Sequence, residues 1–294
     1  MDSIQSLISI VIPLITLVAI PAVLPALLLY RIVRSILGSK FDDKVAGKVV
    51  LITGASSGIG EHLAYEYART EARLVLVARR REQLQAVAQR ARQLGSPEVI
   101  IEIADVSKVE DCKKCVEAAV NHFGRLDHLV NNAGMATICK FEDYTNVDDI
   151  ATDMNVNFWG AIYCTHFAIP HLRKSKGKII VTSSAFGWFP APRLSIHGAS
   201  KAALITLYET LRVEFGADIG VTIVTPGLIE SEMTKGKFLT KDKLISVLKC
   251  KWCLVEMSII PVVTAERCAK AVVNGACSGE KYQTEPSWIK MTLF

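Results

Sequence analysis

The chain has 294 residues, half of them apolar, and a formal net charge of +5 at neutral pH. This is enough for one large α/β domain or two small ones, and the positive charge is too dispersed to indicate a nucleic acid partner. Eight irregularly spaced cysteines exclude a secreted disulfide scaffold and indicate reduced thiols facing the cytosol. Its two Cys-x-x-Cys pairs, Cys112–Cys115 and Cys250–Cys253, lie too far apart for a zinc ribbon, so we expect no metal site.

The N-terminal segment is strongly apolar. No charged side chain occurs between Ser3 and Tyr30, and a helix needs about 20 apolar residues to cross a bilayer. Basic residues follow this run, beginning with Arg31 and Arg34, whereas only Asp2 precedes it. The positive-inside tendency therefore places the bulk of the chain in the cytosol. We expect residues 1–46 to be a hydrophobic membrane anchor with a linker, and residues 47–294 to be the folded domain.

Three prolines interrupt this apolar run, at Pro13, Pro21 and Pro25. Each removes a backbone hydrogen-bond donor, which is costly in lipid unless another group satisfies the freed carbonyl. One interpretation is a hairpin that enters and leaves on the same face, which suits the phospholipid monolayer of a lipid droplet. The other is a kinked single-pass signal anchor. Both predict a membrane-associated protein at the endoplasmic reticulum or a lipid droplet.

A buried strand at Lys48–Thr53 leads into a glycine-rich turn, and a helix is expected from Glu61 to Thr70. A strand, such a turn and a helix form the cradle for a dinucleotide pyrophosphate, which backbone N–H groups at the helix start bind. The turn residues expected to contact the cofactor are Gly54, Ser56, Ser57, Gly58, Ile59 and Gly60.

The second expected strand, Arg73–Ala78, ends at Arg79. An acid near this position binds the ribose hydroxyl of NAD, whereas an arginine can bind the 2′-phosphate of NADP. Arg79 therefore predicts NADP as the cofactor. The next two arginines, Arg80 and Arg81, are interpreted as a solvated helix start.

Two further strands also end in polar loops. Strand Val99–Ala104 ends at Asp105, which we expect to touch the adenine. Strand Leu126–Val130 ends at a turn that we expect to lie beside the cofactor and to pin the central sheet. Its residues are Asn131, Asn132, Ala133 and Gly134. Ligands bind at these carboxyl ends in open α/β sheets.

Residues 47 to about 230 resemble the short-chain dehydrogenase/reductase family. The motifs that carry the resemblance are the Thr53–Gly60 turn, Asp105, the Asn131–Gly134 turn, Asn157, Ser184, Lys201 and Pro226-Gly227. The resemblance implies an α/β fold with a Rossmann-type doubly wound parallel sheet. Within the family, the chain is similar to the plant hydroxysteroid dehydrogenase-like proteins (steroleosins), whose two N-terminal prolines have the spacing of Pro13 and Pro25.

The family resemblance also implies roles for individual residues. Ser184 would hold and polarise the substrate oxygen. Lys201 would bind the nicotinamide ribose and lower the pKa of the neighbouring acid/base. Asn157 would hold the water that links Lys201 to solvent, and Pro226 would join the cofactor contacts. The implied reaction is hydride transfer between NADP(H) and an alcohol or ketone carbon of a sterol-like or other lipid substrate.

One position departs from the family pattern, because His197 stands where the family has its catalytic tyrosine. A neutral imidazole can accept a proton near pH 7, and the charge of Lys201 would favour that neutral form. The imidazole is also shorter than a tyrosine, and a misplacement of ~1 Å can reduce a rate about 100-fold. Three interpretations stay open: a slow enzyme that uses His197, a nucleotide-binding protein without turnover, and an enzyme that recruits another group.

The expected helical stretch Lys235–Glu256 would close over the substrate, and Trp252, Leu254 and Val255 would suit a flat apolar ligand. Two function classes therefore remain. One is an NADP-dependent oxidoreductase that acts on membrane-dissolved lipids. The other is a cofactor-binding structural or regulatory protein of lipid droplets with little or no turnover. A homodimer is one assembly that the sequence allows.

Overall fold

The computed structural model describes residues 11–15, 17, 19, 21, 23, 25, 29, 44–144, 146–230 and 262–289. The chain divides into two compact units, Met1–Asp42 and Asp43–Phe294. The described positions of the first unit are all helical and exposed. Within the described part of the chain, no helix is both long and apolar enough to cross a membrane. Much of the expected anchor and all of the expected helical stretch 235–256 lie outside the described residues.

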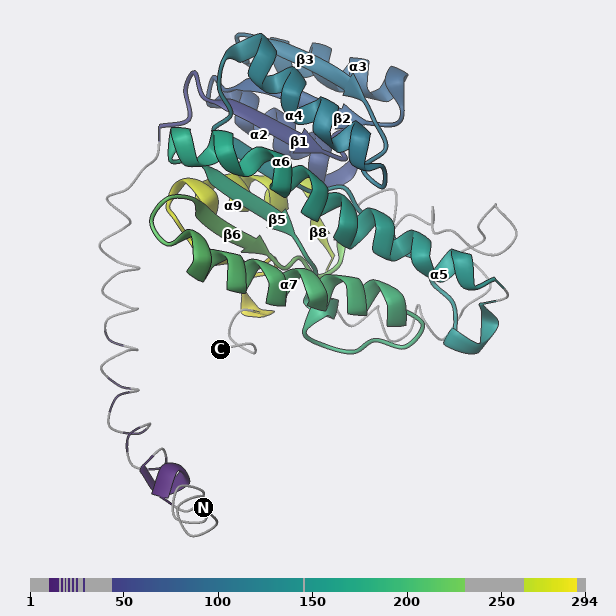
Figure 1. The fold of residues 1–294 in the computed structure, drawn as a ribbon, viewed down its shortest axis with the longest axis vertical. Coiled ribbons are helices and arrows are strands. Elements are labelled where there is room, and N and C mark those ends of the chain that lie inside the picture. Colours follow the sequence, from purple (N-terminus) through teal and green to yellow (C-terminus); the bar gives the residue numbers. More distant parts are fainter. Residues whose placement is uncertain are drawn as a thin grey trace. The chain divides into compact units, whose positions relative to one another are not determined.

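The second unit is built on a seven-stranded parallel sheet with the order β3-β2-β1-β4-β5-β6-β9 (Figure 1). Its strands are β1 (Val49–Thr53), β2 (Arg73–Ala78), β3 (Val99–Ile103), β4 (His128–Asn131), β5 (Lys178–Thr182), β6 (Gly220–Val224) and β9 (Tyr282–Gln283). A separate pair is formed by β7 (Ile229–Glu230) and β8 (Val263–Thr264). The predicted α/β class with a Rossmann-type doubly wound parallel sheet is confirmed.

Helices cover both faces of the sheet (Figure 1). One layer contains α2 (Gly58–Arg69), α3 (Arg81–Gln93) and α9 (Ala265–Cys277), and the other contains α4 (Val109–Phe123), α6 (Gly160–Ser175) and α7 (Ser195–Phe215). Alternate side chains of a strand point to opposite faces. Val50 and Ile52 of β1 therefore pack in the first core, and Val49 and Leu51 pack in the second. Because both faces are buried, these strands are continuously apolar, as the sequence predicts for Lys48–Thr53.

The strand order reverses beside β1, which pairs with β2 on one side and with β4 on the other. In open α/β sheets the crevice at such a switch point, beyond the carboxyl ends of the strands, is where ligands bind. The loops that follow Thr53, Ala78, Asn131 and Thr182 all leave the sheet at this edge.

A continuous helical segment lies between β4 and β5 along the chain. The helix α5 (Val147–Met154), a π-helical turn η2 (Asn155–Trp159) and α6 follow one another without a break. Single π-helical turns inside α-helices occur frequently at functional sites. Here the turn carries Asn157, whose side chain is buried.

Candidate functional site

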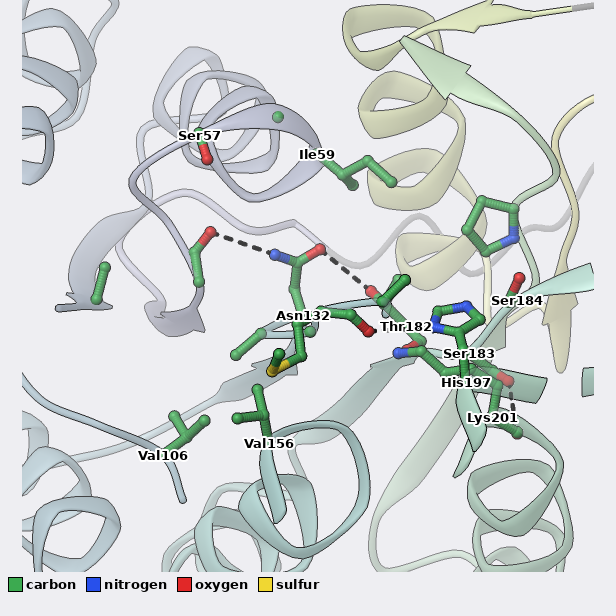
Figure 2. Close-up of a pocket in the computed structure, with 18 of the residues that line it drawn as sticks. Ser57, Ile59, Val106, Asn132, Val156, Thr182, Ser183, Ser184, His197 and Lys201 are labelled. Atoms are coloured by element: carbon green, nitrogen blue, oxygen red, sulfur yellow. Dashed lines mark hydrogen bonds between the residues drawn. The ribbon is translucent and has the colours of Figure 1, made fainter. Parts of the chain in front are cut away.

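The carboxyl edge of the sheet encloses a cavity of about 800 Å³, a size typical of small-molecule sites (Figure 2). Most residues expected at the site line it: Gly54, Ser56, Ser57, Gly58, Ile59, Arg79, Asp105, Asn132, Ala133, Gly134, Ser184, His197, Lys201 and Pro226. Three expected residues, Gly60, Asn131 and Asn157, do not line it. The structure therefore brings the glycine-rich turn and the Ser184–His197–Lys201 group into one cavity.

The glycine-rich turn connects β1 to α2 and has little room for side chains. Gly54 and Gly58 have φ angles of +67° and +59°, a region that favours glycine. A Cβ atom on Gly60 would lie 2.2 Å from the Gly54 carbonyl oxygen. Gly60 thus allows α2 to pack against the turn. It does not line the cavity, and its expected contact with the cofactor stays a prediction.

The start of α2 suits a phosphate group. Its N-cap residue, Ser57, makes no side-chain hydrogen bond to the first turn of the helix. The first N–H groups of a helix have no partner within the helix, and they carry the positive end of the helix dipole. With the cavity in front of them, these N–H groups form an anion-binding site that fits a dinucleotide pyrophosphate.

Two arginines line the cavity beside this turn. Arg79 is exposed. The Arg80 guanidinium instead lies on the turn, where Nη2 donates to Ser56 Oγ at 3.0 Å and to Ser57 Oγ at 2.5 Å. The interpretation of Arg80 as part of a solvated helix start is therefore wrong, whereas Arg81 is exposed as expected. The feature of the sequence that could have indicated a second cation at this site is the adjacent pair Arg79 and Arg80.

Asp105 lines the cavity and follows the end of β3 by two residues. Its carboxylate accepts hydrogen bonds from the Ser107 backbone N–H and hydroxyl. Burial works to raise the pKa of Asp105, but these hydrogen bonds and the nearby charges of Arg79 and Lys108 outweigh it, and the pKa lies below its ordinary value. Asp105 is therefore an ionised hydrogen-bond acceptor at this end of the cavity.

The two asparagines at the end of β4 point in different directions. The Asn131 amide donates to Thr165 Oγ1 at 2.8 Å and to the Tyr208 hydroxyl at 3.0 Å, within the core under α6 and α7. The structure therefore does not place Asn131 in the lining of the cavity, and its expected contact with the cofactor stays a prediction. Asn132 lines the cavity and donates to the Thr53 carbonyl at 3.1 Å, so that it ties β4 to β1.

Ser184 follows β5 and begins the short 3₁₀ turn η3 (Ala185–Gly187). Its Oγ accepts a hydrogen bond from the Phe186 N–H at 3.2 Å, which leaves the hydroxyl proton available to a ligand in the cavity. The neighbouring Ser183 donates to the Lys201 carbonyl at 2.8 Å and so holds α7 against β5. The serine chosen from the sequence is thus the one whose hydroxyl can serve the cavity.

Lys201 is the buried cation of the site. It is 4 % exposed, and its Nζ donates to the Thr182 carbonyl at 2.8 Å. Burial lowers the pKa of Lys201 to about 8, and the charge of Asp153 works in the opposite direction. Lys201 is therefore a cation at neutral pH, although one that loses its proton more readily than a surface lysine.

His197 lies one turn before Lys201 on α7, and both side chains reach the same cavity (Figure 2). Its Nδ1 is 3.1 Å from the Met135 carbonyl oxygen. Burial and the charge of Lys201 lower the pKa of His197 to about 4, against the opposing effect of the hydrogen bond to Met135. His197 is thus a neutral imidazole at physiological pH. The sequence predicts this neutral form from the nearby charge of Lys201, four residues further along the helix.

Asn157 is buried behind His197. Its Nδ2 donates to the Met135 carbonyl and to Ser200 Oγ, each at 3.0 Å, and its Oδ1 accepts from the Met135 N–H at 2.8 Å. Protein acceptors thus use both N–H bonds of the amide. These contacts make Asn157 a positioning residue, and its expected role in holding the water that links Lys201 to solvent stays a prediction.

Asp153 is a further buried group that the sequence analysis missed. It lies one helical turn before Asn157 and is fully buried. Its carboxylate accepts from the Thr137 N–H at 3.0 Å and from the Thr137 hydroxyl at 2.9 Å. The four-residue spacing from Asn157, which places both on one helix face, was the available signal.

Comparison with known proteins agrees with this site. Residues 48–242 match the family model described as short chain dehydrogenase. The "11-beta-hydroxysteroid dehydrogenase A" of Sesamum indicum is 50% identical over 294 residues, covering 100% of this chain and 84% of that protein. The "11-beta-hydroxysteroid dehydrogenase-like 6" of Arabidopsis thaliana is 52% identical over 289 residues, covering 98% of this chain and 84% of that protein.

A solved structure shares the fold. It is an alcohol dehydrogenase from the archaeon Thermococcus sibiricus complexed with 5-hydroxy-NADP, and it aligns with a TM-score of 0.68. The alignment covers 81% of this chain and 94% of that chain at 24% sequence identity.

The two adjacent asparagines should respond differently to substitution. Asn131→Ala should lower the free energy of unfolding by about 1–3 kcal/mol, because it removes two buried hydrogen bonds, to Thr165 and Tyr208. The same variant should keep its nucleotide affinity. Asn132→Ala should weaken nucleotide binding about tenfold, the value of one or two neutral hydrogen bonds. Denaturant unfolding and fluorescence titration measure the two effects, and a loss of nucleotide affinity in folded Asn131→Ala would contradict the assignment.

Proposed function

Because this chain belongs to the short-chain dehydrogenase family and is related to plant hydroxysteroid dehydrogenases, we propose that it moves a hydride between NADP(H) and the hydroxyl or ketone carbon of a sterol-like lipid. The observation that carries the proposal is the shared cavity. The glycine-rich turn lines one part of it, and Ser184, His197 and Lys201 line another. A protein that only bound nucleotide would have no need of that second group.

The preference for NADP(H) rests on charge. Arg79 and Arg80 both line the cavity, and Arg80 is already oriented by two serine hydroxyls of the turn. Guanidinium groups bind phosphate through charge-assisted hydrogen bonds, whereas the ribose hydroxyl of NAD offers no charge to them. The oriented guanidinium and the exposed one together form a site for a 2′-phosphate.

The apolar walls support a sterol-like substrate. Met135, Ala136, Ile138, Phe186 and Leu194 line the cavity near His197. Such walls bind a flat apolar body, while Ser184 supplies a polar contact for one oxygen. The related plant proteins carry hydroxysteroid dehydrogenase in their names.

The reaction in the oxidative direction assigns a task to each residue. When bound, the oxidised nicotinamide supplies the hydride acceptor. Ser184 donates a hydrogen bond to the substrate oxygen and fixes its position. Neutral His197 takes the hydroxyl proton as the carbinol carbon becomes a carbonyl carbon. Lys201 remains charged and keeps the imidazole neutral before the reaction.

The residues that line the cavity bear on the three interpretations that the sequence leaves open. Among the described residues that line it, the titratable groups beside Ser184 are His197 and Lys201. Among these described residues, the alternative acid/base is Lys201. The pKa of His197, about 4, makes it a weak base. This weak basicity is the observation that supports a second candidate function, that of a nucleotide-binding lipid-droplet protein without turnover.

The purified protein, assayed with NADP(H) and a panel of sterol alcohols and ketones, separates the two candidates. The proposed enzyme oxidises at least one alcohol, and His197→Ala lowers that rate by about 10²–10⁴-fold, the contribution of general acid–base catalysis. If neither the parent nor His197→Tyr turns over any sterol while both bind NADP(H), the non-catalytic candidate is correct.

We also propose that residues 1 to about 35 anchor the protein to the endoplasmic reticulum or to lipid droplets, with the folded domain in the cytosol. The uncharged run from Ser3 to Tyr30 and the basic residues after it support this proposal. The anchor would bring the cavity close to membrane-dissolved substrate.

The arginine pair should determine the choice of nucleotide. Arg80→Ala and Arg79→Ala should each weaken NADP(H) binding by about 1.5–3 kcal/mol, the value of a hydrogen bond to a charged group. NAD(H) affinity should change little. Arg81→Ala is the matched control, because Arg81 is exposed at the start of α3. Fluorescence titration measures all three variants, and equal affinity of the parent for both nucleotides would overturn the assignment.

The pH dependence should report the neutral imidazole. Oxidation needs unprotonated His197, so its kcat/KM should be nearly constant above the His197 pKa of about 4, up to the Lys201 pKa of about 8. Reduction needs the protonated ring, so its kcat/KM should fall about tenfold per pH unit across the same range. In His197→Tyr the break should move to higher pH, because an unperturbed phenol has a pKa of about 10. A reduction rate in the parent that is flat from pH 5 to 8 would assign the proton to another group.

Removal of the N-terminal segment should release the folded domain. A chain lacking residues 1–35 retains the whole compact unit Asp43–Phe294. It should leave the membrane fraction and keep the parent's affinity for NADP(H). Flotation on a density gradient measures membrane association. A truncated, folded protein that still floats with lipid would place the anchor elsewhere.

A further inference from the structure

We propose that the Met135 carbonyl group, held by Asn157 and Asp153, fixes which nitrogen of His197 carries the proton, so that Nε2 is the proton acceptor in the cavity. The positioning is a property of the folded chain itself. Only its catalytic consequence rests on the function proposed above.

The contact between His197 and Met135 determines the position of the proton. The Met135 carbonyl oxygen lies 3.1 Å from Nδ1 of the ring. A carbonyl oxygen can only accept a hydrogen bond, so Nδ1 must carry the hydrogen. A neutral imidazole has a single N–H, and the ring is neutral because burial and the charge of Lys201 lower its pKa. Nε2 therefore presents a lone pair.

Asn157 holds the Met135 carbonyl in place. The amide donates to the Met135 oxygen at 3.0 Å and accepts from the Met135 N–H at 2.8 Å, so it binds both backbone polar groups of that residue. These partners also settle the orientation of the amide, because the backbone N–H can only donate and the carbonyl can only accept. The Met135 oxygen thus has one hydrogen bond from Asn157 and one from His197.

The same hydrogen bonds form a closed ring that starts and ends at His197. The second N–H of Asn157 donates to Ser200 Oγ at 3.0 Å, and the Ser200 hydroxyl donates to the His197 carbonyl at 2.7 Å. Ser200 and Asn157 are each about 1 % exposed or less. A buried donor or acceptor left without a partner is costly, so every member of the ring restrains the others.

Asp153 adds a second point of attachment. It accepts two hydrogen bonds from Thr137, at 3.0 and 2.9 Å. Thr137 is two residues beyond Met135, and Asp153 is one helical turn before Asn157. The helical run α5–η2 therefore holds the segment after β4 at two positions, and Met135 cannot rotate its carbonyl group away without breaking one of them.

The fixed proton has a consequence for the direction of the reaction. In the oxidation proposed above, the alcohol loses a hydride from carbon and a proton from oxygen, and that proton goes to Nε2. The resulting imidazolium keeps its Nδ1–H bond to Met135. The other tautomer would present an N–H to the alcohol oxygen and could take no proton from it. Asn157 and Asp153 are thus positioning residues for a base.

The tautomer can be measured without any turnover. The full chain, labelled with ¹⁵N at its six histidines and held in detergent, gives long-range ¹H–¹⁵N correlations that distinguish a protonated from a bare ring nitrogen. His197→Gln identifies the signals of His197. We expect a protonated Nδ1 and a bare Nε2 in the parent. A parent spectrum with the proton on Nε2 would overturn the inference whether or not the protein is an enzyme.

Variants of the two positioning contacts test the cause. Asn157→Ala should give a mixture of tautomers and lower the kcat for oxidation about 10- to 100-fold, in line with the cost of a misplacement of ~1 Å, with the nucleotide affinity unchanged. Thr137→Val keeps the shape of the side chain, loses one hydrogen bond to Asp153 and should show the same change in a milder form. An unchanged tautomer in both folded variants contradicts the inference.

A control variant separates this effect from general loosening of the helix. Asn146 caps α5 by accepting a hydrogen bond from the Asp148 N–H, and it is exposed. Asn146→Ala should destabilise the start of α5 and leave the His197 tautomer as in the parent. A tautomer change in Asn146→Ala equal to that in Asn157→Ala would make the positioning contacts irrelevant. If the parent tautomer is as expected but no sterol is oxidised, the proposed function fails and the positioning stands.

Discussion

The site depends on one buried positive charge, the ammonium group of Lys201. Burial of a charge is costly unless other groups compensate it. Here the Thr182 carbonyl accepts a hydrogen bond from Nζ, and the carboxylate of Asp153 stabilises the charged form. The ammonium favours the neutral form of the His197 ring, and the burial of that ring acts in the same direction. The proton acceptor that we propose, His197, is thus kept neutral by its neighbour one helical turn away.

An imidazole at position 197, where the family has a phenol, suits this environment. A phenol needs a nearby cation to lose its proton near neutrality, whereas an imidazole is already neutral there. In this chain the cation has been kept, and the ring has gained a backbone acceptor for its second nitrogen, the Met135 carbonyl. In the reaction proposed above, His197 would be a base without a readily available acid form, so we expect alcohol oxidation to be favoured over ketone reduction at physiological pH.

Much of the fold could be predicted from the sequence, because its signals are local. The buried strand at Lys48–Thr53 and the glycine-rich turn after it are read from composition and spacing, and strand, turn and helix lie there in the structure. The direction of Asn131 could not be read in this way. Consecutive residues at the end of a strand point in opposite directions, and the sequence does not say which of the two asparagines is directed into the core.

The remaining site residues escaped the sequence analysis for different reasons. The sequence predicts Arg80 to be part of a solvated helix start, whereas its guanidinium is held by two serine hydroxyls of the turn. Met135 acts through its backbone carbonyl, and a backbone group leaves no trace in a sequence. Local sequence patterns do not show these contacts, because they join segments that are more than 20 residues apart along the chain.

The central claim is that this cavity oxidises an alcohol with His197 as the proton acceptor. The most direct measurement follows a sterol alcohol deuterated at the carbinol carbon, incubated with the protein and NADP⁺, with mass spectrometry of the reduced nucleotide. The account predicts that deuterium enters the nucleotide with the parent protein. It also predicts that transfer falls at least about 100-fold in His197→Ala at equal nucleotide occupancy. Equal transfer by the two proteins would contradict it.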